Sequence, residues 1–356
     1  MTRDFDPLFY PFYGMLTKRE QALYRDILPG IRAAQENIKP TVSATTEESF
    51  HVMQAIANDR PEFFWINGGA CEARSRNDVV VSILPVYNQY RSDLPARQAR
   101  FRKAVLSYLS LVKGKKPYEQ ELILHDRLVR DISYVSHSLD QTAYAALVER
   151  RAVCAGYAKA FQFLMQELGI PCYSCSGVAI SRKSTTWENH AWNIIRLGSD
   201  FYNVDITWDD SFDSSEKDFV AHTYFNCTDS QIRQNHRRDT PFDKLPACNG
   251  TKFSFTNISG VTSDLELVYQ DGVTYRTPVR SQADFCNLVE SALRKNKSRK
   301  VQFSFPVKGS ALQKNSMKLF QDVIGKVYPR KGYSINVRTV DYKNGWYKLE
   351  LILELT

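Results

Sequence analysis

Cys154 is the residue of this sequence that is best placed to act as a nucleophile. It precedes a run in which apolar residues recur every three or four positions, which predicts a helix from Ala155 to Leu168. Gly169 and Pro171 end that helix in the usual order. Cys154 therefore comes at the first turn, where unpaired N–H groups and the helix dipole favour a thiolate. Such a thiol can attack a carbonyl carbon at neutral pH if a base lies nearby.

A base and an acidic residue follow in two predicted strands. Residues 188–195 alternate in hydrophobicity, and residues 201–208 form a second run of this kind after a short link. In an antiparallel hairpin, His190 and Asp205 come close together at the open end. Cys154, His190 and Asp205 thus have the types and the order of a nucleophile, a base and a carboxylate that orients the imidazole.

Each of the three residues also has a purely structural interpretation. A lone cysteine at a helix start is usually a small buried apolar residue, with a functional role in only ~10% of cases. A lone histidine on a strand is usually a core residue with satisfied hydrogen bonds, and an aspartate at a strand end is usually a turn or cap residue. Because all three have to occupy particular places on one helix and one hairpin, the combination favours catalysis.

Four motifs resemble the core of the transglutaminase-like superfamily, in its bacterial type. They are Val153-Cys-Ala-Gly-Tyr157-Ala, Gly169-Ile-Pro171, His190-Ala-Trp192 and Tyr202-Asn-Val-Asp-Ile-Thr-Trp208, within residues 120–210. The resemblance implies that Cys154 is the nucleophile, His190 the general base and acid, and Asp205 the orienting carboxylate. It also implies a papain-like fold, in which the nucleophile helix packs on an antiparallel sheet.

The length and composition of the chain indicate a globular protein with more than one domain. Its 356 residues are 43% hydrophobic and 12% aromatic. We predict an α+β protein with a mostly helical N-terminal subdomain (1–115), a transglutaminase-like catalytic core (116–245) and a small basic α+β domain (251–356). Residues 15–250 are expected to form one catalytic unit. In the last domain, the pattern predicts helices 282–295 and 311–327 and strands 273–279, 300–305, 332–340 and 346–355, the last two joined by a turn at Lys343-Asn-Gly345.

The positive charge belongs to the last domain. Residues 251–356 contain 17 Lys and Arg against 9 Asp and Glu, whereas the first 250 residues contain 30 of each. The basic cluster Arg294–Lys300 is interpreted first as a solvated helix end and second as a site for an anionic partner, a wall polymer or nucleic acid. No nucleic-acid-binding motif accompanies it.

No metal and no cofactor are predicted. The seven cysteines are dispersed and odd in number, which is atypical of a disulfide framework. Cys172 and Cys175 form a C-x-x-C without a second pair, so a structural role is favoured roughly nine to one over redox chemistry or zinc. The acidic segment 209–216 lacks the glycine and the final glutamate of a calcium loop. His222 and His236 have no partner that the sequence identifies.

The sequence also bears on membranes and compartment. No run of 18 apolar residues occurs, so no membrane span is expected. The first residues lack the pattern of a secretory signal, so the cytoplasm is the default expectation, or the cell surface or exterior if a signal has been removed.

The favoured function is that of a cysteine peptidase acting on a protein or peptide substrate. The first alternative is a protein-crosslinking transglutaminase, and the second is a binding or scaffold module with an unused site. Tyr157, Trp192 and Trp208 are candidates for the substrate groove or for oxyanion donors beside the backbone N–H of Cys154. Hydrolysis is favoured over transamidation, because the sequence has no calcium loop and the catalytic part is electrically neutral.

Overall fold

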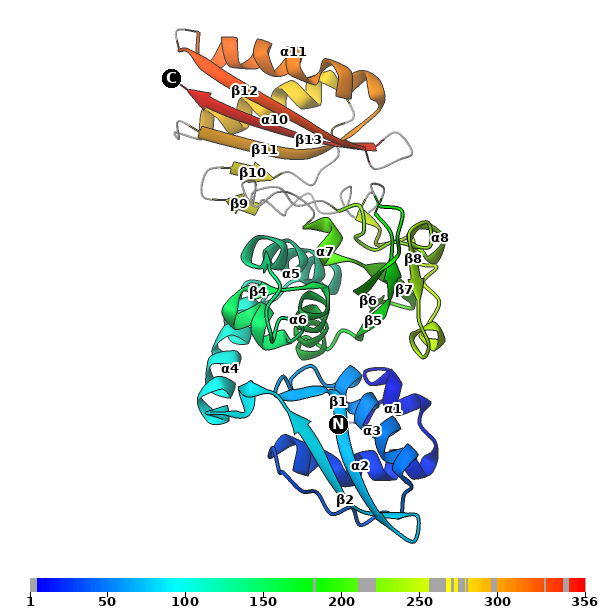
Figure 1. Cartoon of the computed structure of the whole chain (residues 1–356). Coiled ribbons are helices and arrows are strands. Elements are labelled where there is room, and N and C mark those ends of the chain that lie inside the picture. Colours follow the sequence, from blue (N-terminus) through cyan, green and yellow to red (C-terminus); the bar gives the residue numbers. More distant parts are fainter. Residues whose placement is uncertain are drawn as a thin grey trace. The chain divides into compact units, whose positions relative to one another are not determined.

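The computed structural model divides the chain into two compact units, Met1–Thr251 and Lys252–Thr356. It describes residues 5–181, 184–210, 222–255, 267–269, 272–274, 279, 281–295, 300–329, 331–341 and 346–355. Both units mix helices with sheets, as the α+β prediction requires (Figure 1). Among the described residues, no helix has the length and apolar character needed to cross a membrane.

The N-terminal part of the first unit consists of helices and one hairpin. Its elements are α1 (Pro11–Met15), α2 (Lys18–Arg32), α3 (Thr46–Asp59), β1 (Ile66–Arg76), β2 (Val79–Tyr87), a 3-10 turn (Gln89–Arg91) and α4 (Leu94–Ser110). Capping boxes at Thr17 and Thr45 start α2 and α3. The hairpin β1–β2 adds an antiparallel pair to a region predicted to be mostly helical, and α3 packs against β1.

The rest of the first unit is a helix packed on an antiparallel sheet. Its helices are α5 (Pro117–Asp131), α6 (Cys154–Glu167), α7 (Ile206–Asp209) and α8 (Asp229–Ile232), with shorter turns at Ala145–Glu149 and Phe242–Lys244. The sheet has the order β7-β6-β5-β8, formed by β7 (Asp200–Val204), β6 (Glu188–Leu197), β5 (Cys172–Ala179) and β8 (His236–Arg238). A short parallel pair, β3 (Ser133–Tyr134) and β4 (Arg151–Ala152), precedes α6. Helix α6 packs against β5 and β6, where the Asn193 amide donates a hydrogen bond to Ala158 O at 2.8 Å.

Three expectations for this part are wrong in detail. The predicted strand 201–208 ends at Val204, because the Asp205 side chain accepts a hydrogen bond from Trp208 N and starts α7. The sequence also predicts a strand over residues 224–228 and a short helix over residues 230–236. Residues 224–228 instead form turns with one bridge, Asn203 to Cys227. Residues 230–236, predicted as a short helix, divide between α8 and the start of β8.

The second unit is a five-stranded sheet with two helices. The order is β12-β13-β11-β10-β9, from β12 (Tyr333–Asp341), β13 (Trp346–Leu355), β11 (Lys300–Lys308), β10 (Gly272–Thr274) and β9 (Leu267–Tyr269). Helices α10 (Gln282–Lys295) and α11 (Ser310–Val327) bury a common core with the sheet that includes Phe285, Phe320 and Leu351. The predicted turn 343–345, most of the acidic segment 209–216 and part of the basic cluster 294–300 lie outside the described residues. The predicted boundaries at residues 115 and 245 stay predictions.

Candidate active site

Cys154 is the first residue of α6 and is half-buried. No side chain caps this helix, so the first N–H groups of α6 are not taken up by an N-cap side chain. Gly156 lets the helix start approach the preceding segment: a Cβ there would lie 2.4 Å from Asp140 O and 2.7 Å from Ala152 Cβ. The glycine two positions after Cys154 is therefore needed for packing, and it fixes where the thiol emerges.

His190 and Asp205 lie together at the end of the β6–β7 hairpin, as the sequence predicts. His190 Nε2 is 2.7 Å from Asp205 Oδ2, and both side chains are buried. The other oxygen, Oδ1, accepts the hydrogen bond from Trp208 N at 3.1 Å. Asp205 is thus at once the N-cap of α7 and the partner of His190, so the start of this short helix fixes the direction of the carboxylate.

The charges of the site favour a protonated His190. Burial alone lowers the pKa of His190, but the charge of Asp205 and the hydrogen bonds with Asp205 and Cys154 outweigh burial and raise that pKa to about 10. Burial raises the pKa of Asp205, yet His190 and then His236 hold it well below its ordinary value. The three residues therefore form a continuous chain of polar contacts.

His236 is a member of this site for which the sequence identified no partner. Its Nε2 lies 3.0 Å from Asp205 Oδ2, so one carboxylate oxygen lies between two imidazoles. His236 reaches this position on β8, which pairs with β5 rather than with the hairpin that carries His190. No local spacing gives this contact, because it depends on the pairing of β8 with a strand more than fifty residues earlier.

Comparison with known proteins adds the family. Residues 109–206 match the model of the Transglutaminase-like superfamily. The chain carries a transglutaminase-like core. The match contains Cys154, His190 and Asp205, and it ends one residue beyond Asp205.

Solved structures similar to the chain have low identity to it. One described as a TGase is 12% identical and has a TM-score of 0.28, covering 52% of this chain and 55% of that one. A "putative cysteine protease" from Cytophaga hutchinsonii is 18% identical with a TM-score of 0.27, covering 39% of this chain and 61% of that one. Menin, described with its binding site for the Mixed Lineage Leukemia protein, is 12% identical with a TM-score of 0.25, covering 77% and 46%. This chain thus spans little more than half the length of the first two. None of the curated proteins matches the sequence.

The aromatic residues named from the sequence occupy different places in the transglutaminase-like core. Trp208 is half-buried, with its ring centroid 5.4 Å from that of His190 and 4.4 Å from that of His236. Trp192 is buried and donates from Nε1 to Asn203 Oδ1 at 3.2 Å. Tyr157 is also buried, and its hydroxyl lies 2.6 Å from Asp210 Oδ2 and 3.1 Å from Ile132 O. The structure thus places Trp208 beside the histidines, and the groove and oxyanion roles of all three stay predictions.

An open pocket of about 330 Å³ lies at the His190 side of the core. His190, Trp208, Tyr134, Ser181, Glu188 and Asp210 are among the residues that line it. Tyr134 is 57% exposed and forms hydrogen bonds with the backbone and the side chain of Cys154. Tyr134 and His190 each interact with Cys154 and also line the pocket, so they connect Cys154 to it. Tyr134 is a site residue that the sequence analysis missed.

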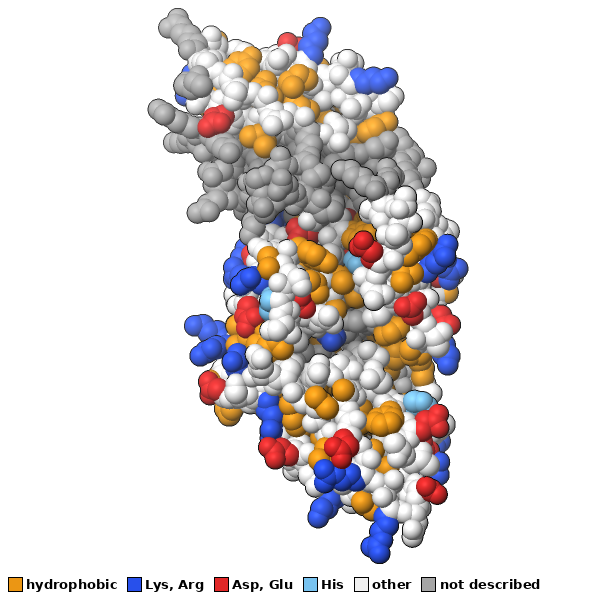
Figure 2. Space-filling view, in the orientation of Figure 1, with side chains coloured by type: hydrophobic (Ala, Val, Ile, Leu, Met, Phe, Trp, Pro, Cys, Tyr) orange, Lys and Arg blue, Asp and Glu red, His pale blue; other side chains and the backbone are white. Residues whose placement is uncertain are grey.

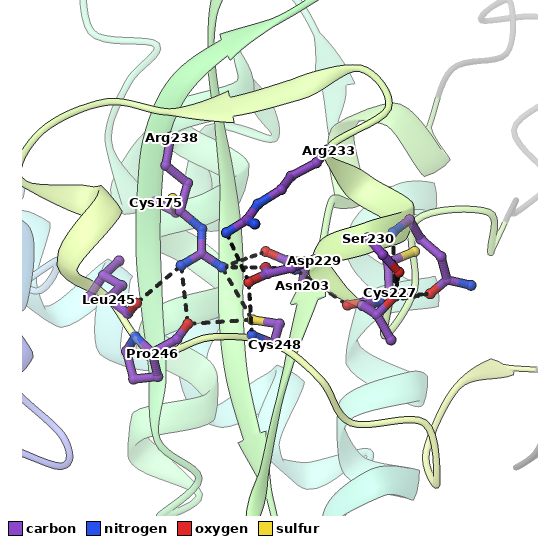
Figure 3. Close-up of polar contacts among 12 residues, drawn as sticks. Cys175, Asn203, Cys227, Asp229, Ser230, Arg233, Arg238, Leu245, Pro246 and Cys248 are labelled. Carbon is purple, nitrogen blue, oxygen red and sulfur yellow. Dashed lines mark hydrogen bonds and ion pairs between the residues drawn. The ribbon is translucent and has the colours of Figure 1, made fainter.

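Strand β8, which carries His236, is tied to neighbouring segments by the half-buried Arg238. The Arg238 guanidinium donates to Asp229 Oδ1 at 2.8 Å and to the carbonyl oxygens of Leu245 and Pro246 at 3.2 and 3.1 Å (Figure 3). Cys248 lies beside the same guanidinium, with Sγ 3.4 Å away (Figure 3). Cys175 is buried in β5 near this network, and among the described residues both cysteines are free thiols.

Proposed function

We propose that the transglutaminase-like core catalyses cysteine-dependent acyl transfer at an amide or peptide bond, and that it is a peptidase. The proposal rests on one observation. Cys154, at the start of α6, interacts with His190, and His190 in turn contacts Asp205. A thiol at a helix start beside a cationic imidazole is the arrangement of an activated cysteine nucleophile.

In the proposed reaction each residue has one step. Cys154 Sγ attacks the carbonyl carbon, and the tetrahedral intermediate collapses to a thioester as His190 gives its proton to the leaving amine. Water then attacks the thioester, with His190 accepting its proton, and the acid product leaves with the thiol restored. Asp205 does not exchange protons, because its pKa lies well below the ordinary range; it orients the imidazole and stabilises its charge.

The character of the pocket supports hydrolysis. Transfer to an amine requires that water be excluded from the thioester, and the polar residues Ser181, Glu188 and Asp210 are among the lining of this pocket. A polar lining favours water as the acyl acceptor.

A crosslinking transglutaminase is the second candidate, and one observation favours it. Glu188 and Asp210 both line the pocket, and carboxylates there would attract the ammonium group of a lysine side chain. The third candidate is a binding module with an unused site, which would not explain the contact between Cys154 and His190.

The test is an assay that follows both products at once. The protein is incubated with a casein-like substrate and a fluorescent primary amine, with and without calcium, beside the Cys154→Ala variant. We expect new peptide termini, little amine incorporation and no effect of calcium. Dominant amine incorporation that Cys154→Ala abolishes would instead establish the transglutaminase. If neither product forms although Cys154 reacts with alkylating reagents, the binding module is the better account.

A further inference from the structure

A second buried cluster of histidines and carboxylates lies in the first unit, apart from Cys154. It consists of His125 and Asp126 on α5, Asp209 at the end of α7, and His222. All four side chains are buried. His125 Nδ1 is 3.1 Å from Asp126 Oδ1, and His222 Nε2 is 2.7 Å from the same oxygen. His125 Nε2 is 3.2 Å from Asp209 Oδ2.

His125 lies between two acidic side chains, and a neutral imidazole between two carboxylates cannot satisfy both contacts. Both of its ring nitrogens face carboxylate oxygens, which only accept hydrogen bonds. A neutral imidazole has one N–H, so one of the two contacts would set a nitrogen lone pair against an oxygen lone pair. Either a second proton or a metal ion has to lie on one side of the ring.

The arrangement on the Asp126 side is that of a metal site. His125 Nδ1, Asp126 Oδ1 and His222 Nε2 come from two separate parts of the chain and lie within 4.8 Å of one another. Ligand atoms about 2.0–2.2 Å from one tetrahedral ion are separated by roughly 3.3 Å. The measured separations of 3.1 and 2.7 Å are shorter by at most about 0.6 Å, a change that small side-chain rotations supply.

The Asp209 side supplies the outer partner that metal-bound histidines have. A ligating histidine usually donates its other ring N–H to a carboxylate, which fixes the ring and raises its basicity. Here that carboxylate is Asp209, whose second oxygen is itself fixed by Tyr224 N–H at 3.0 Å. A proton on His125 explains the contact with Asp209 equally well, and Asp126 Oδ1 can accept from both imidazoles, as Asp205 Oδ2 does from His190 and His236. The two explanations therefore differ in whether the cluster takes up an ion, which can be measured.

We propose that His125, Asp126 and His222 bind one divalent transition-metal ion, with zinc the best match to two imidazoles and a carboxylate. Asp209 is the outer carboxylate. Its place on α7, four residues after Asp205, means that the ion ties α5 to the helix that presents Asp205. The role is positioning and stabilising, and the proposal does not depend on the activity of Cys154.

The test measures metal content and affinity in the full chain. The wild-type protein is stripped with a chelator and dialysed against buffered Zn²⁺, and bound zinc is measured by mass spectrometry; thermal unfolding is followed with and without Zn²⁺. We expect about one equivalent of zinc per chain and a higher unfolding temperature with zinc. Co²⁺ in place of zinc is expected to give the visible absorption of a four- or five-coordinate ion.

Variants separate this cluster from the one at Asp205. His222→Gln and Asp126→Asn are expected to abolish stoichiometric binding, and Asp209→Asn to weaken it by about 10- to 100-fold. His236→Gln and Cys154→Ala serve as controls, and both are expected to keep the full equivalent. The proposal is overturned if the wild type binds no zinc, Mn²⁺ or Co²⁺ and shows no thermal shift, which would identify the cluster as a protonated imidazole network. It is equally overturned if the controls lose the metal and His222→Gln retains it.

Discussion

Asp205 lies between two histidines, and its charge determines the protonation of the nearer one. The pKa of His190 is raised from its ordinary value of 6.5 to about 10, with the charge of Asp205 the largest of the effects that raise it. We therefore expect the proton that the leaving amine needs to be retained over the neutral range, and turnover to be lost only as the pH rises through about 10.

The variant Asp205→Asn tests this linkage. Loss of the carboxylate charge is expected to lower turnover by up to ~10⁴-fold, as amidation of the acid does in a serine-protease triad. The alkaline limb of the pH profile should also move down toward 6.5, because the imidazolium loses its counter-charge. The measurement is kcat/KM against pH for both proteins. An unchanged limb in Asp205→Asn would show that the carboxylate does not hold the His190 proton.

His236 contributes by positioning Asp205. A hydrogen bond to a charged group contributes about 1.5–3 kcal/mol, so His236→Leu should lower turnover by about 10- to 100-fold. His236→Gln keeps an N–H donor and is expected to recover part of that loss. Equal loss in both variants, with both still folded by circular dichroism, would assign His236 a packing role.

At the scale of single residues, the contacts that could be predicted from the sequence are those formed within one helix or one hairpin. Cys154 at a helix start and His190 near Asp205 follow from one helix pattern and one hairpin, so both could be predicted. The contacts of His236 with Asp205 and of His125 with Asp209 join elements that are far apart in the sequence. Nothing in the spacing of single histidines contains that information, and it emerges only with the tertiary fold.

Among the elements, α6 shows how packing limits its sequence. A methyl group added at Gly156 would lie 2.4 Å from the backbone carbonyl oxygen of Asp140. Because that oxygen belongs to the backbone, no side-chain rotation can relieve the clash. Gly156→Ala is therefore expected to destabilise the first unit by roughly 1–3 kcal/mol and to slow reaction at Cys154.

Urea unfolding and the rate of Cys154 alkylation measure the two effects. Gly325→Ala is the matched control, since it also places alanine in a helix, α11, but meets nothing within 4 Å. It should be neutral or stabilise by up to about 1 kcal/mol. If the two variants behave alike, close packing at Gly156 is not what fixes the helix start.

The elements also show why some predicted boundaries were wrong. Hydrophobic alternation continues through Trp208, but the side chain of Asp205 bonds Trp208 N and converts the end of the strand into a helix start. Strand β1 was missed because its hairpin turns at Asn77 and Asp78, both with positive φ, in a sequence without the glycine that commonly signals such a turn. In the first case a capping side chain decided the structure, and in the second a turn built without glycine.

For the whole molecule, the two units have separate cores, and the candidate active site lies wholly in the first. The described surface in Figure 2 shows Lys and Arg interspersed with Asp and Glu over the N-terminal elements, in keeping with the equal numbers of each charge in residues 1–250. Residues 251–356 contain an excess of basic residues, and an anionic partner for the second unit stays a prediction.

A core substitution in the second unit tests the separation. Leu351 is fully buried among the residues of α10, α11 and β13, so Leu351→Ala should destabilise that unit by about 2–5 kcal/mol. The rate of Cys154 alkylation is expected to stay unchanged. A parallel fall in Cys154 reactivity would mean that the second unit supports the site.

The most direct measurement of the central claim is the labelling of the intact protein with a library of peptide-amide electrophiles, followed by peptide mapping of the adduct. Burial raises the pKa of Cys71 to about 11 and, against the opposing charge of Arg238, that of Cys248 to about 12, so these thiols should react slowly at neutral pH. The account predicts one adduct per chain, on Cys154, formed much more slowly in His190→Ala and in Asp205→Asn. An adduct on another cysteine, or a Cys154 that reacts equally fast without His190, would contradict it.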